Sequence, residues 1–184
     1  MAKDLNVTIN FDMDGTIADL YGVENWLPDL RAENTRPYAE AKPLVNMSVL
    51  ARTLNRLIEN GNEVNIISWT SKGGSADYNK RVAETKRKWL NKHLRSVKFS
   101  NIFIVPYGTP KETVASGILF DDEEHNRTNW GENAYTEKEI FKVLTSIRRA
   151  SRLCGFSPGA VRQSAQTNLK NSLNICVFCH LVFF

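Results

Sequence analysis

The sequence predicts an α/β fold with a parallel sheet, because short apolar runs alternate with segments of helical periodicity over residues 1–147. Each apolar run is short enough for a strand, and the helical segments repeat apolar side chains every three or four residues. Acidic or hydroxyl side chains stand at the ends of several of these runs. In open α/β sheets, ligands bind at the carboxyl ends of the strands. We therefore expect Asp12, which follows the first of these runs, to lie at such an edge.

The first predicted strand covers residues 7–11 and runs directly into two acids. The order at positions 12–16 is Asp-Met-Asp-Gly-Thr, and Gly15 permits a sharp bend that leads the chain away from the sheet. Carboxylates this close repel each other unless a cation or a shared proton lies between them. An ordinary Asp-Gly turn after a strand is the simpler interpretation, and the motifs farther along the chain favour a site instead.

The middle of the chain supplies an insert, two helices and a strand. Residues 18–43 contain several prolines and aromatic side chains, and we expect an irregular insert there. Residues 44–58 have helical spacing and precede an Asn-Gly-Asn stop. The second strand, over residues 63–68, ends in a serine. The helix predicted over residues 76–93 is rich in Lys and Arg, which we expect to form a solvated face.

Two more strands follow, with a lysine between them. The third strand is predicted over residues 102–106. A short helix should begin near Lys111, with Thr109 as its N-cap and Pro110 as its first residue. The fourth strand, over residues 117–121, leads into paired acids.

The last predicted helix covers residues 136–147, with Thr136 as its N-cap and Glu139 at the capping-box position. Residues 148–184 then contain five basic residues and no acid, which leaves 19 basic and 20 acidic residues in the first 147. A near-neutral domain with a basic tail does not indicate a nucleic-acid-binding surface spread over the fold. We assign residues 1–147 to one domain and expect the tail to be disordered or loosely packed.

All three cysteines, at positions 154, 176 and 179, lie in that tail. The Cys-Val-Phe-Cys-His run at positions 176–180 matches a haem-attachment pattern, but the sequence shows neither the export signal nor the haem pocket that this interpretation requires. Two cysteines and one histidine are also fewer than the four ligands of a structural zinc site. We find no secretory signal and no apolar run of about 20 residues, and therefore expect a cytoplasmic protein that does not cross a membrane.

Four motifs, taken in order, resemble those of the haloacid dehalogenase (HAD) superfamily, whose members transfer phosphoryl groups through an aspartate nucleophile. Each motif follows the local structure that the family pattern requires, and the resemblance covers roughly residues 5–147. The motifs are Asp-x-Asp-Gly-Thr at residues 12–16, an apolar strand ending in Ser68, Lys111 near a helix start, and an apolar strand ending in Asp121-Asp122.

The spacing of these motifs also resembles small phage-type and bacterial members related to the 5′(3′)-deoxyribonucleotidases. The chain departs from that pattern in the Gly-rich loop at residues 69–74 and in the acidic run at residues 122–125. Both lie beside the expected phosphate site, so the substrate is the property that these departures affect.

The resemblance implies a three-layer, Rossmann-like (HAD-type) sheet with helices on both faces, in which residues 18–43 form a minimal cap over a catalytic domain of residues 1–147. It implies that Asp12 attacks phosphorus and that Asp14 acts as general acid and base. A carboxylate attacks an anionic phosphate only where charge is neutralised, so we expect Mg²⁺, held by Asp12, the backbone carbonyl of Asp14 and Asp121.

The remaining motif residues are expected to bind the phosphate or to support the site. Ser68 is expected to donate a hydrogen bond to a phosphoryl oxygen, with Thr70 as the alternative hydroxyl. Lys111 is expected to neutralise the phosphate and the nucleophile. Asp122 is expected to orient Lys111 or a metal-bound water without binding the ion.

We therefore expect a Mg²⁺-dependent phosphomonoester hydrolase, acting through an aspartyl-phosphate on a nucleotide or another small phosphate ester, as a 5′-nucleotidase does. The aromatic side chains of residues 18–43 are suited to stacking on a base. Two alternatives stay open: a catalytically silent binding or regulatory module with the same fold, and a phosphatase that acts on nucleic-acid ends. The sequence does not determine the oligomeric state.

Overall fold

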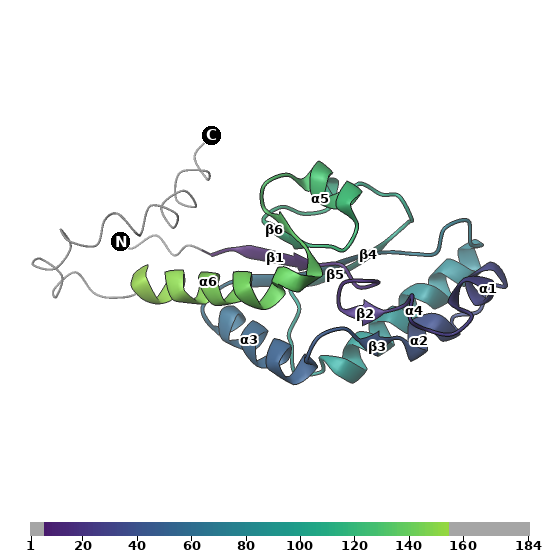
Figure 1. Cartoon of the computed structure of the whole chain (residues 1–184), viewed down its shortest axis with the longest axis horizontal. Coiled ribbons are helices and arrows are strands. Elements are labelled where there is room, and N and C mark those ends of the chain that lie inside the picture. Colours follow the sequence, from purple (N-terminus) through teal and green to yellow (C-terminus); the bar gives the residue numbers. More distant parts are fainter. Residues whose placement is uncertain (1–5, 155–184) are drawn as a thin grey trace, which may run out of the picture.

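Five parallel strands form the central sheet, in the order β5-β4-β1-β6-β7 (Figure 1). The computed structural model describes residues 6–154, with side chains described up to residue 150. The α/β class and the parallel sheet are confirmed, and the arrangement is consistent with a Rossmann-like fold. The strands are β1 (Thr8–Phe11), β4 (Glu63–Trp69), β5 (Asn101–Val105), β6 (Ile118–Phe120) and β7 (Ala134–Tyr135).

Helices cover both faces of the sheet. The chain steps outward from β1 to β4 and β5 through α3 (Met47–Glu59) and α4 (Ala76–His93). It then returns to the other side of β1, through the 3₁₀ turn η1 (Lys111–Thr113), to β6, and continues through α5 (Glu124–Trp130) to β7. Right-handed crossovers in opposite directions place these connections on opposite faces. Figure 1 shows α3 and α6 (Ile140–Cys154) on one side of the strands and α5 on the other.

The main hydrophobic core lies on the face that α3, α4 and α6 cover. Alternate strand residues point to this face because side chains in a strand alternate between the two sides. They pack against apolar side chains of the three helices, and the sheet is thereby held rigidly at its centre. Buried members of this core include Ile9, Phe11, Val64, Ile66, Phe120, Leu54, Trp89, Leu90 and Leu144.

Three asparagines on the opposite face form a ladder across neighbouring strands. Asn10, Asn65 and Asn101 are partners in the parallel register. Asn65 donates to Asn10 at 3.0 Å, and Asn101 donates to Asn65 at 3.1 Å. The amide of Asn10 donates to the backbone carbonyl of Ser116 at 2.9 Å. Since each buried amide finds a partner, the ladder favours one register and so fixes which residues stand at the strand ends.

Residues 18–43 are more ordered than expected. The segment begins in β2 (Ala18–Asp19) and ends in β3 (Lys42–Pro43), which pair in an antiparallel two-stranded sheet. Between them lie two short helices, α1 (Trp26–Arg31) and α2 (Arg36–Glu40). The prediction of an irregular insert is therefore wrong in detail, because proline at the start of α2 is compatible with a first helical turn.

Several predicted boundaries shift. The capping box of Thr136 and Glu139 is present, but it opens a 3₁₀ turn, η2 (Glu137–Glu139), before α6. Helix α6 continues to Cys154, beyond its predicted end at residue 147. The prediction of an N-cap at Thr109 is wrong, because its hydroxyl donates to the carbonyl of Pro106 and only η1 follows. Helix α5 and strand β7 were not predicted.

The segment 155–184, which holds the haem-like motif, lies outside the described residues. Among the residues that the structure describes, no helix combines the length and apolar character needed to span a membrane.

Candidate active site

Three parallel strand ends meet at one edge of the sheet and carry the predicted site residues there. Asp12 follows β1 and Asp121 follows β6, and the last residues of these two strands are register partners. The backbone N–H of Asp12 donates to the carbonyl of Phe120 at 2.9 Å, which extends the pairing by one step. Ser68 stands near the end of β4, on the other side of β1. The topology thus brings together residues that lie more than 100 positions apart.

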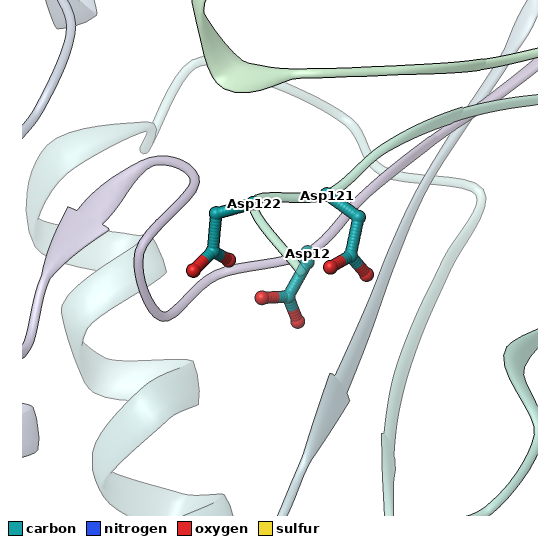
Figure 2. A group of neighbouring side chains, drawn as sticks. All are labelled: Asp12, Asp121 and Asp122. Atoms are coloured by element: carbon teal, nitrogen blue, oxygen red, sulfur yellow. The ribbon is translucent and has the colours of Figure 1, made fainter. Parts of the chain in front are cut away.

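Asp12, Asp121 and Asp122 form an acid cluster that is suited to a cation. One carboxylate oxygen from each residue lies within 4.8 Å of the others, and Figure 2 shows the three groups gathered at the ends of β1 and β6. Asp12 is 6% exposed and Asp121 is fully buried. Oxygens that bind one Mg²⁺ at about 2.0–2.1 Å lie about 2.9 Å apart when they are adjacent and about 4.2 Å apart when they are opposite. The three carboxylates would therefore draw closer together in order to share one ion as hard oxygen donors.

The cluster contains two of the three residues predicted to hold metal and adds Asp122, which was expected only to support the site. The carboxylate of Asp14 lies outside the cluster because it pairs with a lysine instead. The part predicted for the backbone carbonyl of Asp14 stays a prediction.

Lys111 lies between two members of the acid cluster. Its Nζ is 2.8 Å from Asp12 Oδ1 and 2.6 Å from Asp121 Oδ2, and its side chain is 2% exposed. The ammonium also lies 4.9 Å from the centre of the Trp69 ring. Burial alone lowers the pKa of Lys111, but the carboxylates of Asp12 and Asp121 outweigh it and raise that pKa above its ordinary value. Lys111 is therefore a permanent cation beside the expected nucleophile, and its ion pairs are with Asp12 and Asp121.

The bend after β1 is fitted to the acid cluster. Gly15 has φ +79, and a Cβ at this position would lie 2.2 Å from Asp122 Oδ2, so only glycine satisfies both the backbone and the space. The hydroxyl of Thr16 accepts from the backbone N–H of Asp122 at 3.1 Å and contacts Asp122 Oδ1 at 3.2 Å. Gly15 and Thr16, which follow the two acids of the first motif, thus hold Asp122 of the fourth motif in place.

Two residues of α5 form hydrogen bonds to Asp121 and Asp122 and hold them in place. The Asn126 amide lies 3.2 Å from both carboxylate oxygens of Asp121. Arg127 donates to the backbone carbonyls of Asp121 and Asp122, at 2.8 Å and 2.6 Å. Arg127 could not be selected from the sequence, because its contacts are to backbone carbonyls and leave no pattern of side-chain types.

Burial and mutual repulsion disfavour the charged form of two of these acids. Burial, with the nearby Asp12 carboxylate, raises the pKa of Asp121 to about 6. The same two causes, in the same order, raise the pKa of Asp122 to about 7. Near neutral pH, Asp122 is therefore partly protonated and Asp121 is mostly ionised; without a cation, Asp121 takes up its proton as the pH falls through about 6.

Lys86 is the site residue that the sequence prediction missed. It was assigned to the solvated face of the helix over residues 76–93, but its side chain is 1% exposed. Its Nζ donates to Asp14 Oδ2 at 2.5 Å, to Ser68 Oγ at 2.9 Å and to the carbonyl of Trp69 at 2.6 Å. The overlooked signal is spacing, because Tyr78, Val82, Lys86 and Leu90 are each four residues apart and all are buried.

A cleft of about 400 Å³ opens above these residues. Asp12, Asp14, Ser68 and Lys111 contribute to it, and so does Thr70, so both candidate hydroxyls remain available. The insert adds one aromatic pair, in which the rings of Tyr21 and Trp26 are 5.1 Å apart. A second pair consists of Trp69 at the end of β4 and Tyr107 in the loop after β5, whose rings are 5.0 Å apart. Further lining residues are Leu20, Leu27, Leu30, Arg31, Tyr38, Ser71, Lys72 and Glu123.

Neither a scan against models of known protein families nor a search of curated proteins finds a match for this chain.

Mg²⁺ should stabilise the fold, and more strongly at about pH 8 than at about pH 5.5, because protons compete with the ion for the acid cluster. Because folding raises the pKa values of Asp121 and Asp122, protonation of these two acids stabilises the metal-free fold at low pH. This stabilisation is lost as the pH rises through about 6 for Asp121 and about 7 for Asp122. Thermal unfolding with excess Mg²⁺ or with chelator, at both pH values, measures the shift.

Asp121→Asn should abolish most of this Mg²⁺ effect at the higher pH. Asp77→Asn, on an exposed residue of α4, is the matched control and should leave it unchanged. An equal shift in wild type and Asp121→Asn would show that the ion binds elsewhere.

Proposed function

We propose that this protein is a Mg²⁺-dependent phosphomonoester hydrolase that acts through an aspartyl-phosphate on Asp12. The main support for the proposal comes from the groups that surround the carboxylate of Asp12. Its carboxylate faces a cleft, lies 2.8 Å from a buried ammonium and belongs to a cluster of acids that favours a cation. The four motifs that resemble the HAD superfamily all contribute residues to this one place, which supports a HAD-type active site.

The charges explain why a cation belongs to the proposal. When ionised, the acid cluster carries three negative charges, and Lys111 balances one of them. A phosphate dianion that approached this arrangement would be repelled. Mg²⁺ held by Asp12, Asp121 and Asp122 would neutralise the remaining charge and polarise a phosphoryl oxygen. The sum of the charges at the cluster would then be near zero before the substrate arrives.

The chemical step uses the two acids of the first motif. An Asp12 oxygen forms a bond to phosphorus while the bond from phosphorus to the ester oxygen breaks. Asp14 gives its proton to the departing alkoxide, which leaves as an alcohol. Asp14 then accepts a proton from water as the water oxygen attacks phosphorus, and this releases phosphate and restores Asp12. Burial raises the pKa of Asp14 above its ordinary value, although Lys86 opposes this, and a raised pKa suits a proton donor.

The walls of the cleft favour a small ester with a flat, apolar part, and a nucleotide is such a molecule. A volume of about 400 Å³ is typical of a site for a small molecule. Tyr21 and Trp26 from the insert and Tyr107 from the loop after β5 supply aromatic faces for a base. Arg31 and Lys72, which also line the cleft, would attract an anionic ligand.

Asp12→Asn should abolish hydrolysis of simple phosphate esters, because the amide lacks the charge and the lone-pair reactivity of the carboxylate. The change hardly alters the shape of the side chain, and circular dichroism should report an intact fold. Turnover of an aryl phosphate in excess Mg²⁺ measures the effect. Asp19→Asn changes a nearby acid that does not line the cleft and serves as the control. Substantial activity in Asp12→Asn would exclude the covalent mechanism.

Tyr107→Ala should raise KM for nucleoside monophosphates by a factor of roughly 2 to 10, since aromatic pairs contribute about 0.5–1.5 kcal/mol. KM for a small alkyl phosphate should change little. Tyr107 is 46% exposed, so the fold should tolerate its removal, and Leu44→Ala, on a residue that is 43% exposed and away from the cleft, is the matched control. Phosphorylated oligonucleotides belong in the same series, and a preference for them would replace the small-nucleotide proposal. An equal rise in KM for every ester would show that Tyr107 does not contact a base.

A further inference from the structure

Lys86 is a buried cation whose hydrogen-bonding capacity is fully used. An ammonium has three N–H donors, and the three acceptors of Lys86 lie at 2.5, 2.9 and 2.6 Å. The ammonium also lies 5.0 Å from the centre of the Tyr38 ring, which adds a cation–π contact from the insert. With every donor engaged, the ammonium has one orientation, and it fixes the groups that it contacts.

Those groups belong to different parts of the proposed site. Asp14 comes from the bend after β1, whereas Ser68 and the Trp69 carbonyl come from the end of β4. Both Asp14 and Ser68 also line the cleft. Lys86 therefore connects the expected proton donor with the expected phosphate ligand through one atom.

The connection determines which atoms of the two groups face the substrate. Lys86 occupies Asp14 Oδ2, and within the described part of the chain Asp14 Oδ1 has no hydrogen-bond partner. Lys86 also occupies a lone pair of Ser68 Oγ, so the hydroxyl hydrogen of Ser68 is left to point away from the ammonium. An oxygen that can carry a proton and a hydroxyl that can donate are thus both held ready.

A structural role alone explains this lysine poorly. Replacing a buried ion pair by apolar side chains of similar size is often neutral or stabilising, so the pair is weak evidence of a contribution to stability. The neighbouring buried residues of α4, at the same four-residue spacing, are apolar or aromatic. A residue like them would fill the space of Lys86 but would leave Asp14 and Ser68 unoriented.

We propose that Lys86 is a positioning residue that holds Asp14 and Ser68 in their reactive orientations, and this rests on the proposed phosphatase function. As the bond from phosphorus to the ester oxygen breaks, the proton passes from Asp14 Oδ1 to that oxygen, while Oδ2 stays hydrogen-bonded to Lys86. Lys86 itself exchanges no proton and does not touch the substrate.

The test compares Lys86→Met with Lys88→Met, an exposed lysine of the same helix. The readout is kcat/KM in excess Mg²⁺ for an alkyl phosphate and for 4-nitrophenyl phosphate. An alkoxide needs the Asp14 proton in order to leave, whereas nitrophenolate leaves without it. General acid catalysis typically contributes about 10²–10⁴-fold. Lys86→Met should therefore lower kcat/KM for the alkyl ester by roughly 100-fold or more. The loss of kcat/KM for the aryl ester should be smaller by a factor of at least about ten. Lys88→Met should match wild type.

Equal losses on the two esters, or no loss, would overturn the role of Lys86 while leaving the phosphatase proposal intact. A wild-type protein inactive on both esters would instead overturn the proposed function. Lys86→Met leaves the Asp14 carboxylate unpaired and can fail to fold. The double variant Asp14→Asn with Lys86→Met removes both charges. Its ratio of kcat/KM on the alkyl ester to kcat/KM on the aryl ester should equal that of Asp14→Asn alone, within about threefold, because the part of Lys86 that acts through Ser68 affects both esters alike. A further change of tenfold or more in this ratio would show that Lys86 does not act through Asp14.

Discussion

The compensation of buried negative charge at the carboxyl edge of the sheet is the constraint on which the other features depend. Parallel pairing of β1 and β6 brings Asp12 and Asp121 side by side, and the bend at Gly15 lets Asp122 approach them. Carboxylates this close and this buried are unfavourable unless cations balance them. Lys111 balances part of the charge, Lys86 pairs with Asp14, and the acid cluster retains oxygen atoms that suit a further cation. The residues whose burial is unfavourable at this edge are the same ones that the proposed phosphoryl transfer requires.

Much of the fold could be predicted because its signals are local. Short apolar runs identified four of the five strands of the central sheet, and α4 was predicted at its observed bounds from its amphipathic pattern. In the structure, the side chain of Ser75 caps the start of that helix. The short helices of the insert were missed because five or six residues are too few to show a helical period. They are held by packing in three dimensions, since α2 packs against α4 and α1 packs against α2. The 3₁₀ turn at Lys111 was mistaken for a helix because Thr109 and Pro110 are typical of a helix start whether or not a helix follows.

The site was predictable where its residues carry a motif, and less so where they act through three-dimensional contacts. Asp12, Asp14, Ser68, Lys111 and Asp121 were selected because four motifs, taken in order, resemble those of the HAD superfamily. Lys86 could not be separated by composition from the five other Lys and Arg residues of its helix, and only its place among the buried residues at four-residue spacing distinguishes it. Arg127 and Asn126 hold the acids through a helix that the sequence did not predict. Asp122 joins the acid cluster because its carboxylate packs against Gly15 in the bend after β1. The order of residue types along the chain does not reveal this close approach.

The central claim is that Asp12 becomes phosphorylated during turnover, and chemical trapping of this intermediate tests it most directly. An acyl phosphate is reduced by borohydride to an alcohol, which converts a phosphorylated aspartate to homoserine. Wild-type protein, quenched with borohydride during turnover of an aryl phosphate in Mg²⁺, should yield a peptide with homoserine at position 12. Asp12→Asn and a chelator-treated sample should not. Homoserine at another aspartate, or an active wild-type enzyme that never yields the reduced peptide, would contradict the mechanism.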